Sequence, residues 1–231
     1  MIDKHILVDC PPTALASLRN AGISPADIDT ILITHVHGDH VFGFPFLLLE
    51  RKYISDREGM KKLTVAGSSG VRERLTHLCK LAYPGSLEEI LQSINWVDIP
   101  DLKGWTMERF EVLHDPEVDP HGWMLTNDEG WSMIHSGDSG PCEELWNRIG
   151  RSKFAIVEMA VPEWVPTNHH HKPSDINKLA KQFPDTTIVI THTYIDSDYK
   201  ILTKEVPDFP ENVIHGEDNM RFELDSNGSI C

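Results

Sequence analysis

Four histidine and aspartate side chains follow directly after a short apolar run in the first fifth of the sequence. Residues 31–33 read Ile-Leu-Ile, and the segment THVHGDH behind them contains His35, His37, Asp39 and His40. Such an apolar run favours a buried strand. A loop that leaves a strand can turn side chains of both parities toward one point. We therefore expect a fold whose strand ends present polar groups, with this segment at one of them.

Three imidazoles and one carboxylate within six positions indicate metal binding. A single histidine is more often a surface or capping residue, but four such residues after a strand fit that explanation poorly. Imidazole and carboxylate without thiolate suit zinc, manganese or iron, and a metal that keeps a water can turn it into a nucleophile near neutral pH. One loop cannot supply all the ligands of two ions. The remaining ligands should therefore come from other strand ends.

The apolar pattern of the whole chain predicts a mixed α/β fold in a single domain over residues 1–231. Strands are expected at residues 5–8, 31–33, 63–66, 154–159, 187–190, 212–215 and 220–224. An antiparallel meander is expected at residues 107–113, 123–126 and 131–134. Helices are expected near residues 71–81, 87–94, 142–149 and 174–183.

Composition limits the cellular location and the binding partners that we expect for this chain. No apolar run reaches the length of a membrane span, no signal core opens the chain, and the four cysteines are scattered without a CxxC pair. We expect a soluble cytoplasmic protein with no membrane contact. The formal net charge of −15 opposes an extended phosphate backbone, so a small-molecule substrate is favoured and nucleic acid is disfavoured.

Three further residues lie just past predicted strands. His114 follows residues 107–113, Asp138 lies in SGDSG after residues 131–134, and His192 follows residues 187–190. HVHGDH, a later histidine, GDSG and a last histidine, in this order, resemble the signature of metallo-β-lactamase-fold hydrolases over nearly the full chain. The resemblance implies an αββα sandwich of two mixed β-sheets flanked by helices.

The same resemblance implies two divalent metal ions, zinc foremost, with a water or hydroxide between them as the nucleophile. One ion would be held by His35, His37 and His114, the other by Asp39, His40 and His192, with Asp138 bridging them. Asp39 would also be catalytic, and Asp9 would orient a ligand imidazole. His121 is the rival of His114 as a ligand, and His135 is read as a structural histidine.

The segment after GDSG is similar to the phosphodiesterase branch of that superfamily, which includes class II cyclic nucleotide phosphodiesterases and ribonuclease Z. The segments that match the order of that branch are Gly137 to Pro141, Leu145-Trp146, Glu158 and the run His170-His171-Lys172-Pro173. The match to the family proline selects His170 from three consecutive histidines. It implies that His170 is the general acid that protonates the leaving oxygen of a phosphodiester. Glu158 is expected to contact a residue of the site without itself binding the metals.

Two departures from the branch keep other interpretations open. Gly38 stands where cyclic nucleotide enzymes carry a bulkier apolar residue, and the chain starts almost on the strand at residues 5–8, where relatives carry further strands. The first sheet is therefore expected to be shortened, or completed by a partner in a homodimer. A phosphodiesterase acting on a small soluble diester such as a cyclic nucleotide is the leading hypothesis. The alternatives are a ribonuclease Z-like RNA endonuclease, a thioester or lactone hydrolase, and a non-catalytic, metal-stabilised nucleotide-binding protein.

Overall fold

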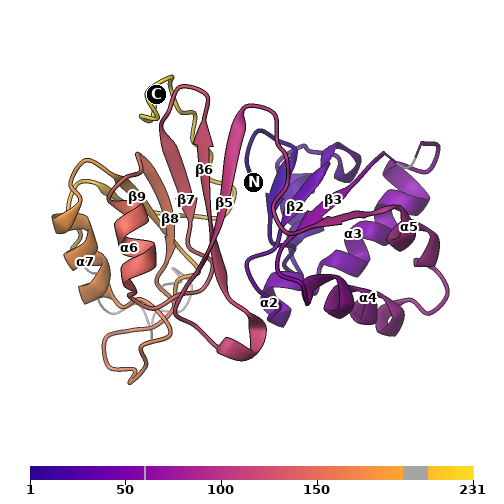
Figure 1. Cartoon of the computed structure of the whole chain (residues 1–231), viewed down its shortest axis with the longest axis horizontal. Coiled ribbons are helices and arrows are strands. Elements are labelled where there is room, and N and C mark those ends of the chain that lie inside the picture. Colours follow the sequence, from indigo (N-terminus) through magenta and orange to yellow (C-terminus); the bar gives the residue numbers. More distant parts are fainter. Residues whose placement is uncertain (60, 195–207) are drawn as a thin grey trace. The chain divides into compact units, whose positions relative to one another are not determined.

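The computed structural model describes residues 1–59, 61–194 and 208–231 (Figure 1). It divides into two compact units, Met1–Pro100 and Asp101–Cys231, which are described separately below. The single domain expected from the sequence remains a prediction beside this division. Within the described residues, no helix is long and apolar enough to cross a membrane.

The sheet of the first unit consists of four short parallel strands. Their order is β1-β2-β3-β4, and they are Ile6–Val8, Thr30–Leu32, Thr64–Ala66 and Asn95–Val97. In register, Leu7 lies beside Ile31, and Ile31 beside Val65. Parallel neighbours need crossover connections, which helices usually supply. Here these helices are α1 (Ala14–Asn20), α2 (Gly38–Val41), α3 (Phe44–Glu50), the π-helical turn η2 (Arg51–Ser55), α4 (Val71–Ala82) and α5 (Glu88–Ser93).

The core of the first unit lies between this sheet and its helices. Ile31 and Val65 from the strands pack in one cluster with Phe44 and Leu47 from α3 and Leu75 from α4. Fully buried aliphatic and aromatic side chains of this kind each contribute about 1.5–3 kcal/mol relative to exposure. The strands are therefore held rigidly where their carboxyl ends pass into loops.

The sheet of the second unit has six strands in the order β10-β9-β8-β7-β6-β5. They are β5 (Trp105–Glu111), β6 (His121–Asn127), β7 (Ser132–His135), β8 (Phe154–Glu158), β9 (Thr187–Thr191) and β10 (Val213–His215). The pairs β5-β6 and β6-β7 are antiparallel, and β7-β8, β8-β9 and β10-β9 are parallel. Helices α6 (Glu143–Ile149) and α7 (Pro173–Gln182) lie side by side against the sheet (Figure 1) and share one core with its strands.

Most elements expected from the sequence are confirmed, including the antiparallel meander β5-β6-β7. The expected strand at residues 220–224 is wrong: this segment makes only an isolated bridge between Leu224 and Ile230. Its apolar residues alternate with polar ones, but it joins neither sheet. The strand β4 (Asn95–Val97) was not expected, because three half-buried residues give almost no pattern. Two sheets flanked by helices confirm the expected mixed α/β class.

Candidate metal centre

In the first unit, the HVHGDH segment wraps from the end of β2 into the single turn of α2. His37 lies at the N-cap of α2, and Asp39 and His40 belong to its turn. The ring centroids of His35 and His40 are 4.0 Å apart, and those of His35 and His37 are 4.8 Å apart. The chain leaves β2 and enters α2 at once, so the rings of His35, His37 and His40 lie close together, as expected.

Asp9 is the buried carboxylate that organises these rings. Its Oδ2 accepts hydrogen bonds from His40 Nδ1 at 2.8 Å and from the Thr34 hydroxyl at 2.8 Å, and its Oδ1 accepts from the Thr34 backbone N–H at 2.8 Å. Asp9 lies at the end of β1 with a φ of 55°, a left-handed conformation that is uncommon for a residue other than glycine. Strain of this kind persists where surrounding contacts over-determine it, and it concentrates at functional sites.

These hydrogen bonds also settle where the imidazole protons lie. The Thr34 hydroxyl donates to Asp9, so His35 Nδ1, 3.0 Å from that hydroxyl, donates to it. In a neutral ring, a protonated Nδ1 leaves the lone pair on Nε2. His40 Nδ1 donates to Asp9 in the same way. Nε2 is therefore the nitrogen that each ring can offer to a metal, with the other ring nitrogen held by a neighbour, as is usual in metal sites.

The spacing of His35 and His37 fits one shared ion. His35 Nε2 and His37 Nδ1 are 3.1 Å apart. Two nitrogens bound to a tetrahedral zinc at its usual bond length would be about 3.3 Å apart. Imidazoles beside the Asp39 carboxylate form the donor set that zinc, manganese and iron accept.

In the second unit, the structure brings together three residues that are far apart in sequence. Ligand atoms of His114, Asp138 and His170 all lie within 4.8 Å of one another. His114 and Asp138 are buried, and His170 is half-buried. The ring of His114 is 4.8 Å from that of His170, and its Nδ1 donates to the carbonyl of His169 at 3.1 Å. As in the first unit, Nε2 is then the nitrogen that this ring can offer to a metal.

Gly140 allows this cluster to close. Its N–H donates to the carbonyl of Leu113, the residue before His114, at 2.7 Å. A Cβ on Gly140 would lie 1.6 Å from the backbone oxygen of Asn168. The backbones of Leu113, before His114, and of Asn168, before His170, can therefore both lie against residue 140 because glycine has no side chain. Sequence reasoning did not single out Gly140, although it belongs to the GDSG motif.

Glu158 holds His170 as Asp9 holds His40. Its Oε1 accepts from His170 Nδ1 at 2.8 Å and from the Ser139 N–H at 3.0 Å, and its Oε2 accepts from the Ala160 N–H at 2.7 Å. Glu158 is 1% exposed. Burial raises the pKa of this carboxyl, and the hydrogen bond from His170 opposes that shift. The carboxylate thereby fixes the orientation of the His170 ring through Nδ1.

The three consecutive histidines have three different environments. His169 is exposed, His170 joins the cluster, and His171 is fully buried. His171 Nδ1 donates to the carbonyl of Ser139 at 2.6 Å, while its Nε2 accepts from the indole N–H of Trp146 at 3.1 Å. Both ring nitrogens are thus used in the neutral form, and burial lowers the pKa of His171 to about 4. His171 is a structural residue that joins the histidine loop, residues 169–171, to the GDSG loop, residues 137–140.

His192 extends the cluster at the end of β9. Its Nε2 lies 3.6 Å from Asp138 Oδ2, and its ring is nearly parallel to that of His170 at 6.3 Å. Like Asp9, it has a left-handed backbone, with a φ of 48°. One candidate residue in each unit is therefore strained at the exit of a strand.

The rival histidines take other partners. His121 opens β6, and its Nδ1 donates to the backbone carbonyl of Asp119 at 2.7 Å. It belongs to none of the potential metal groups among the described residues, whereas His114 does. His135 ends β7, and its Nδ1 accepts from the Gly137 N–H at 3.1 Å. These contacts favour His114 over His121 as the ligand.

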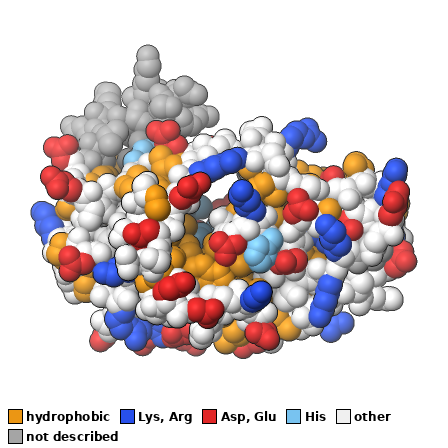
Figure 2. All heavy atoms as spheres, turned by 90° about the horizontal axis from the view of Figure 1, so that it is seen from above, with side chains coloured by type: hydrophobic (Ala, Val, Ile, Leu, Met, Phe, Trp, Pro, Cys, Tyr) orange, Lys and Arg blue, Asp and Glu red, His pale blue; other side chains and the backbone are white. Residues whose placement is uncertain are grey.

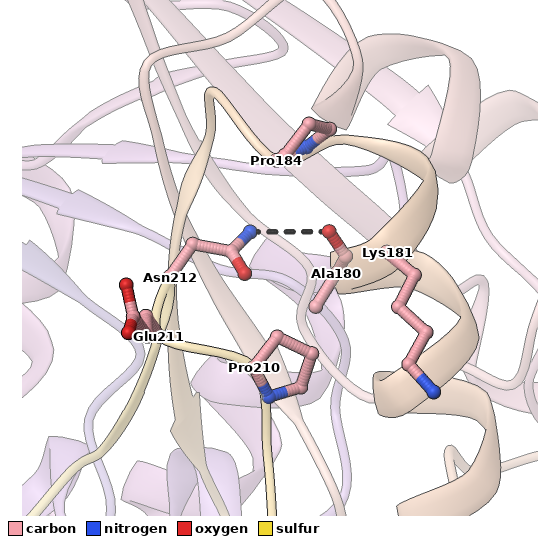
Figure 3. A pocket seen from close by; sticks show the side chains of 6 residues that line it. All are labelled: Ala180, Lys181, Pro184, Pro210, Glu211 and Asn212. Atoms are coloured by element: carbon pink, nitrogen blue, oxygen red, sulfur yellow. Dashed lines mark hydrogen bonds between the residues drawn. The ribbon is translucent and has the colours of Figure 1, made fainter.

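The pocket in Figure 3 lies outside this cluster. It has a volume of about 560 Å³ and is lined by Ala180, Lys181, Pro184, Pro210, Glu211 and Asn212. Asn212 Nδ2 donates to the carbonyls of Ala180, Phe183 and Thr186 at 3.0–3.3 Å. None of the candidate ligands lines this pocket, and its Asn212 side chain joins the end of α7 to the segment before β10.

Charged side chains are mixed over the face displayed in Figure 2, where Lys and Arg alternate with Asp and Glu rather than gathering by sign.

The chain is similar in sequence to a described family and to curated relatives. The profile of the family described as Anti-Pycsar protein Apyc1 matches residues 2–200. A ribonuclease Z of Pyrobaculum calidifontis is 22% identical over 225 residues, covering 83% of this chain and 77% of that protein.

Two solved structures share the architecture. The metallo-β-lactamase fold protein YhfI from Bacillus subtilis superposes with a TM-score of 0.66 at 17% identity, over 86% of this chain and 78% of that one. The short form of human tRNase Z superposes with a TM-score of 0.70 at 18% identity, over 95% and 88%. At these identities the likeness establishes the fold.

The prediction of a metallo-β-lactamase-superfamily hydrolase similar to ribonuclease Z and the phosphodiesterases is confirmed, and the histidine and aspartate clusters indicate divalent metal binding. The expectation that nucleic acid is disfavoured gains no support from relatives named ribonuclease Z. The homodimer stays a prediction.

Proposed function

The chain belongs to the Anti-Pycsar protein Apyc1 family, and from this premise we propose that it is a dinuclear metal-dependent phosphodiesterase acting on a small soluble diester such as a cyclic nucleotide. The observation that carries the proposal is the hydrogen bond from His170 Nδ1 to the buried Glu158, in a cluster with His114 and Asp138. A ring held in this way resembles a proton donor more than a surface histidine.

The proposed ligands are the seven histidine and aspartate residues named from the sequence. His35, His37 and His114 would hold one ion, Asp39, His40 and His192 the other, and Asp138 would bridge them. Zinc is the proposed metal, because imidazole and carboxylate donors without thiolate suit it. When bound, the pair of ions supplies an activated water and neutralises charge on the phosphoryl oxygens.

The residues of the chain then divide the remaining work. Asp9 and Thr34 hold two ligand rings in the tautomer that offers Nε2. Asp39, exposed on α2, is proposed both as a ligand and as the carboxylate that positions the attacking water. His170 gives its Nε2 proton to the leaving oxygen, and Glu158 stabilises the ring while it is charged.

The substitution His170→Ala tests the proposal. Metal-loaded variant and wild type are compared on 3′,5′-cyclic nucleotides and on bis(p-nitrophenyl) phosphate, and bound metal is measured by elemental analysis. We expect full metal content and a kcat lowered about 10²- to 10⁴-fold on the cyclic nucleotide. The loss should be smaller for the p-nitrophenyl ester, whose leaving group needs less help from an acid. His77→Ala, an exposed histidine on α4, is the control.

Three results would contradict the assignment. Loss of metal in His170→Ala would make His170 a ligand. Cleavage of a thioester or lactone without cleavage of phosphodiesters would keep the fold and refute the substrate class. Nucleotide binding without any turnover in the wild type would indicate the non-catalytic alternative.

Ribonuclease activity is the second candidate, favoured by the relatives named ribonuclease Z. A precursor transfer RNA assayed beside the cyclic nucleotide separates the two. Because binding of RNA depends on phosphate contacts, a ribonuclease should also lose affinity steeply as salt rises, whereas a small diester should show a shallow dependence.

A further inference from the structure

The loop between β8 and α7 begins and ends on one carboxylate. Glu158, the last residue of β8, accepts from the Ala160 N–H at 2.7 Å and from His170 Nδ1 at 2.8 Å. The eleven intervening residues therefore form a closed loop, both ends of which are held by the carboxylate of Glu158. Trp164 lies six positions before His170, and six residues of chain reach at most about 20 Å.

The loop is held in place by hydrogen bonds at several points. Glu163 accepts from the backbone N–H of Ser174 at 3.1 Å and from its hydroxyl at 2.6 Å, which ties the loop to the first turn of α7. The Val165 N–H donates to the Pro162 carbonyl at 3.1 Å. At its far end the loop packs on Gly140 through Asn168. Trp164 is thus carried on a fixed backbone.

Trp164 is 76% exposed although the loop around it is ordered by these contacts. The other five tryptophans are all buried or half-buried. A tryptophan ring offers a large apolar face whose immobilisation costs little conformational entropy. Its exposure on a fixed loop leaves that face ready for a flat ligand.

We propose that Trp164 stacks on the nucleobase of the substrate and so makes this site selective for nucleotides over diesters that lack a base. The inference rests on the proposed function, because it assigns the base of a mononucleotide to an exposed ring on the loop that ends at His170. Every base has a flat face, so stacking of this kind raises affinity without selecting one base strongly. Specificity among bases would need other contacts.

Binding rather than turnover tests this inference. Metal-loaded wild type, Trp164→Ala and Trp164→Phe are titrated calorimetrically with adenosine monophosphate and with ribose 5-phosphate, which lacks the base. We expect Trp164→Ala to raise the Kd for adenosine monophosphate about 5- to 100-fold and to leave the Kd for ribose 5-phosphate within about 2-fold. Trp164→Phe should retain most of the affinity. Tyr53→Ala, an exposed aromatic residue of the first unit, is the matched control and should change neither Kd.

The outcomes separate this inference from the proposed function. A wild type that cleaves no phosphodiester but shows the expected pattern of Kd values would refute the phosphodiesterase alone. Equal weakening of both ligands by Trp164→Ala, or of neither, would overturn the stacking. If Trp164→Ala weakens only a short single-stranded RNA and not adenosine monophosphate, the assignment to mononucleotides is wrong.

Discussion

In the first unit one carboxylate organises two rings, whereas in the second unit a carboxylate of the same kind organises one. Asp9 holds His40 directly and His35 through Thr34. Glu158 holds His170, and a backbone carbonyl holds His114. Both carboxylates are buried at the end of a strand. The chemistry of support is the same, but the supported rings have different proposed tasks.

That difference assigns different consequences to similar changes. The rings on Asp9 are proposed metal ligands, so damage to Asp9 should weaken metal binding. The ring on Glu158 is a proposed proton donor, so damage to Glu158 should slow turnover with the metal still in place. Substitutions that neutralise each carboxylate without changing its size test whether the two units divide the work in this way.

The substitution Glu158→Gln should have the largest effect. Glutamine keeps the size of the side chain but gives up the negative charge that favours a charged His170. We expect kcat on a cyclic nucleotide to fall about 10²- to 10⁴-fold, as for loss of the acid itself, with unchanged metal content. The measurements are steady-state kinetics and elemental analysis.

The matched control is Glu108→Gln, in the same unit. Glu108 accepts two hydrogen bonds from the Arg148 guanidinium at 3.0 and 2.6 Å and is none of the candidate site residues. The kcat of Glu108→Gln should match that of the wild type. If Glu158→Gln instead loses metal while kcat per bound metal is unchanged, the proposed division between the units is broken.

The substitution Asp9→Asn should act on metal affinity. An amide nitrogen cannot accept, so at least one of the three hydrogen bonds to Asp9 is lost, and a ligand ring loses its fixed orientation. Loss of such a supporting group typically costs about 10- to 100-fold in metal affinity. Competition with a chelator measures the Kd, and kcat at saturating metal should fall less than in Glu158→Gln.

Asp56→Asn is the matched control for Asp9→Asn. Asp56 is also a buried carboxylate of the first unit, but it pairs with Arg51 at 3.1 Å. Its substitution should lower the free energy of unfolding and leave metal affinity unchanged. Equal metal affinity in Asp9→Asn and wild type would show that Asp9 serves the fold and not the ligands.

The two units also differ in how far the sequence predicts them. In the first, four candidate ligands lie within six positions, so a short motif identifies the cluster without the fold. In the second, His114, Asp138 and His170 are separated by strands and helices, and the family order of motifs was needed to connect them. The run His169-His170-His171 gives the same signal three times; the match to the family proline selected His170, and the structure adds that the three rings differ in burial.

The roles of two other residues could not be read from the sequence, although both lie in the motifs that identify the site. Thr34 acts through the direction of one hydroxyl, and Gly140 through the close approach of a distant backbone oxygen. Both depend on contacts that form only after the chain has folded. Periodicity predicts which segments are strands and helices, but it carries no information on which carbonyl a given side chain will meet.

The smallest expected effect is that of His171 on the pH dependence of the free energy of unfolding. It tests how the histidine loop is held in the second unit. Its pKa is lowered to about 4 in the folded chain, against about 6.5 when unfolded, so between these values the unfolded chain binds more protons and acid favours unfolding. The stabilisation is complete above about pH 6.5 and is lost as pH falls toward 4. Denaturant unfolding of metal-free protein should show a loss of about 1 kcal/mol from this residue between about pH 7.5 and pH 5.5. His171→Asn, which keeps a donor for the Ser139 carbonyl but does not titrate, should lack that part of the slope. Identical slopes in variant and wild type would mean that the ring is protonated in the folded chain, and the hydrogen bond from Trp146 would then not form as described.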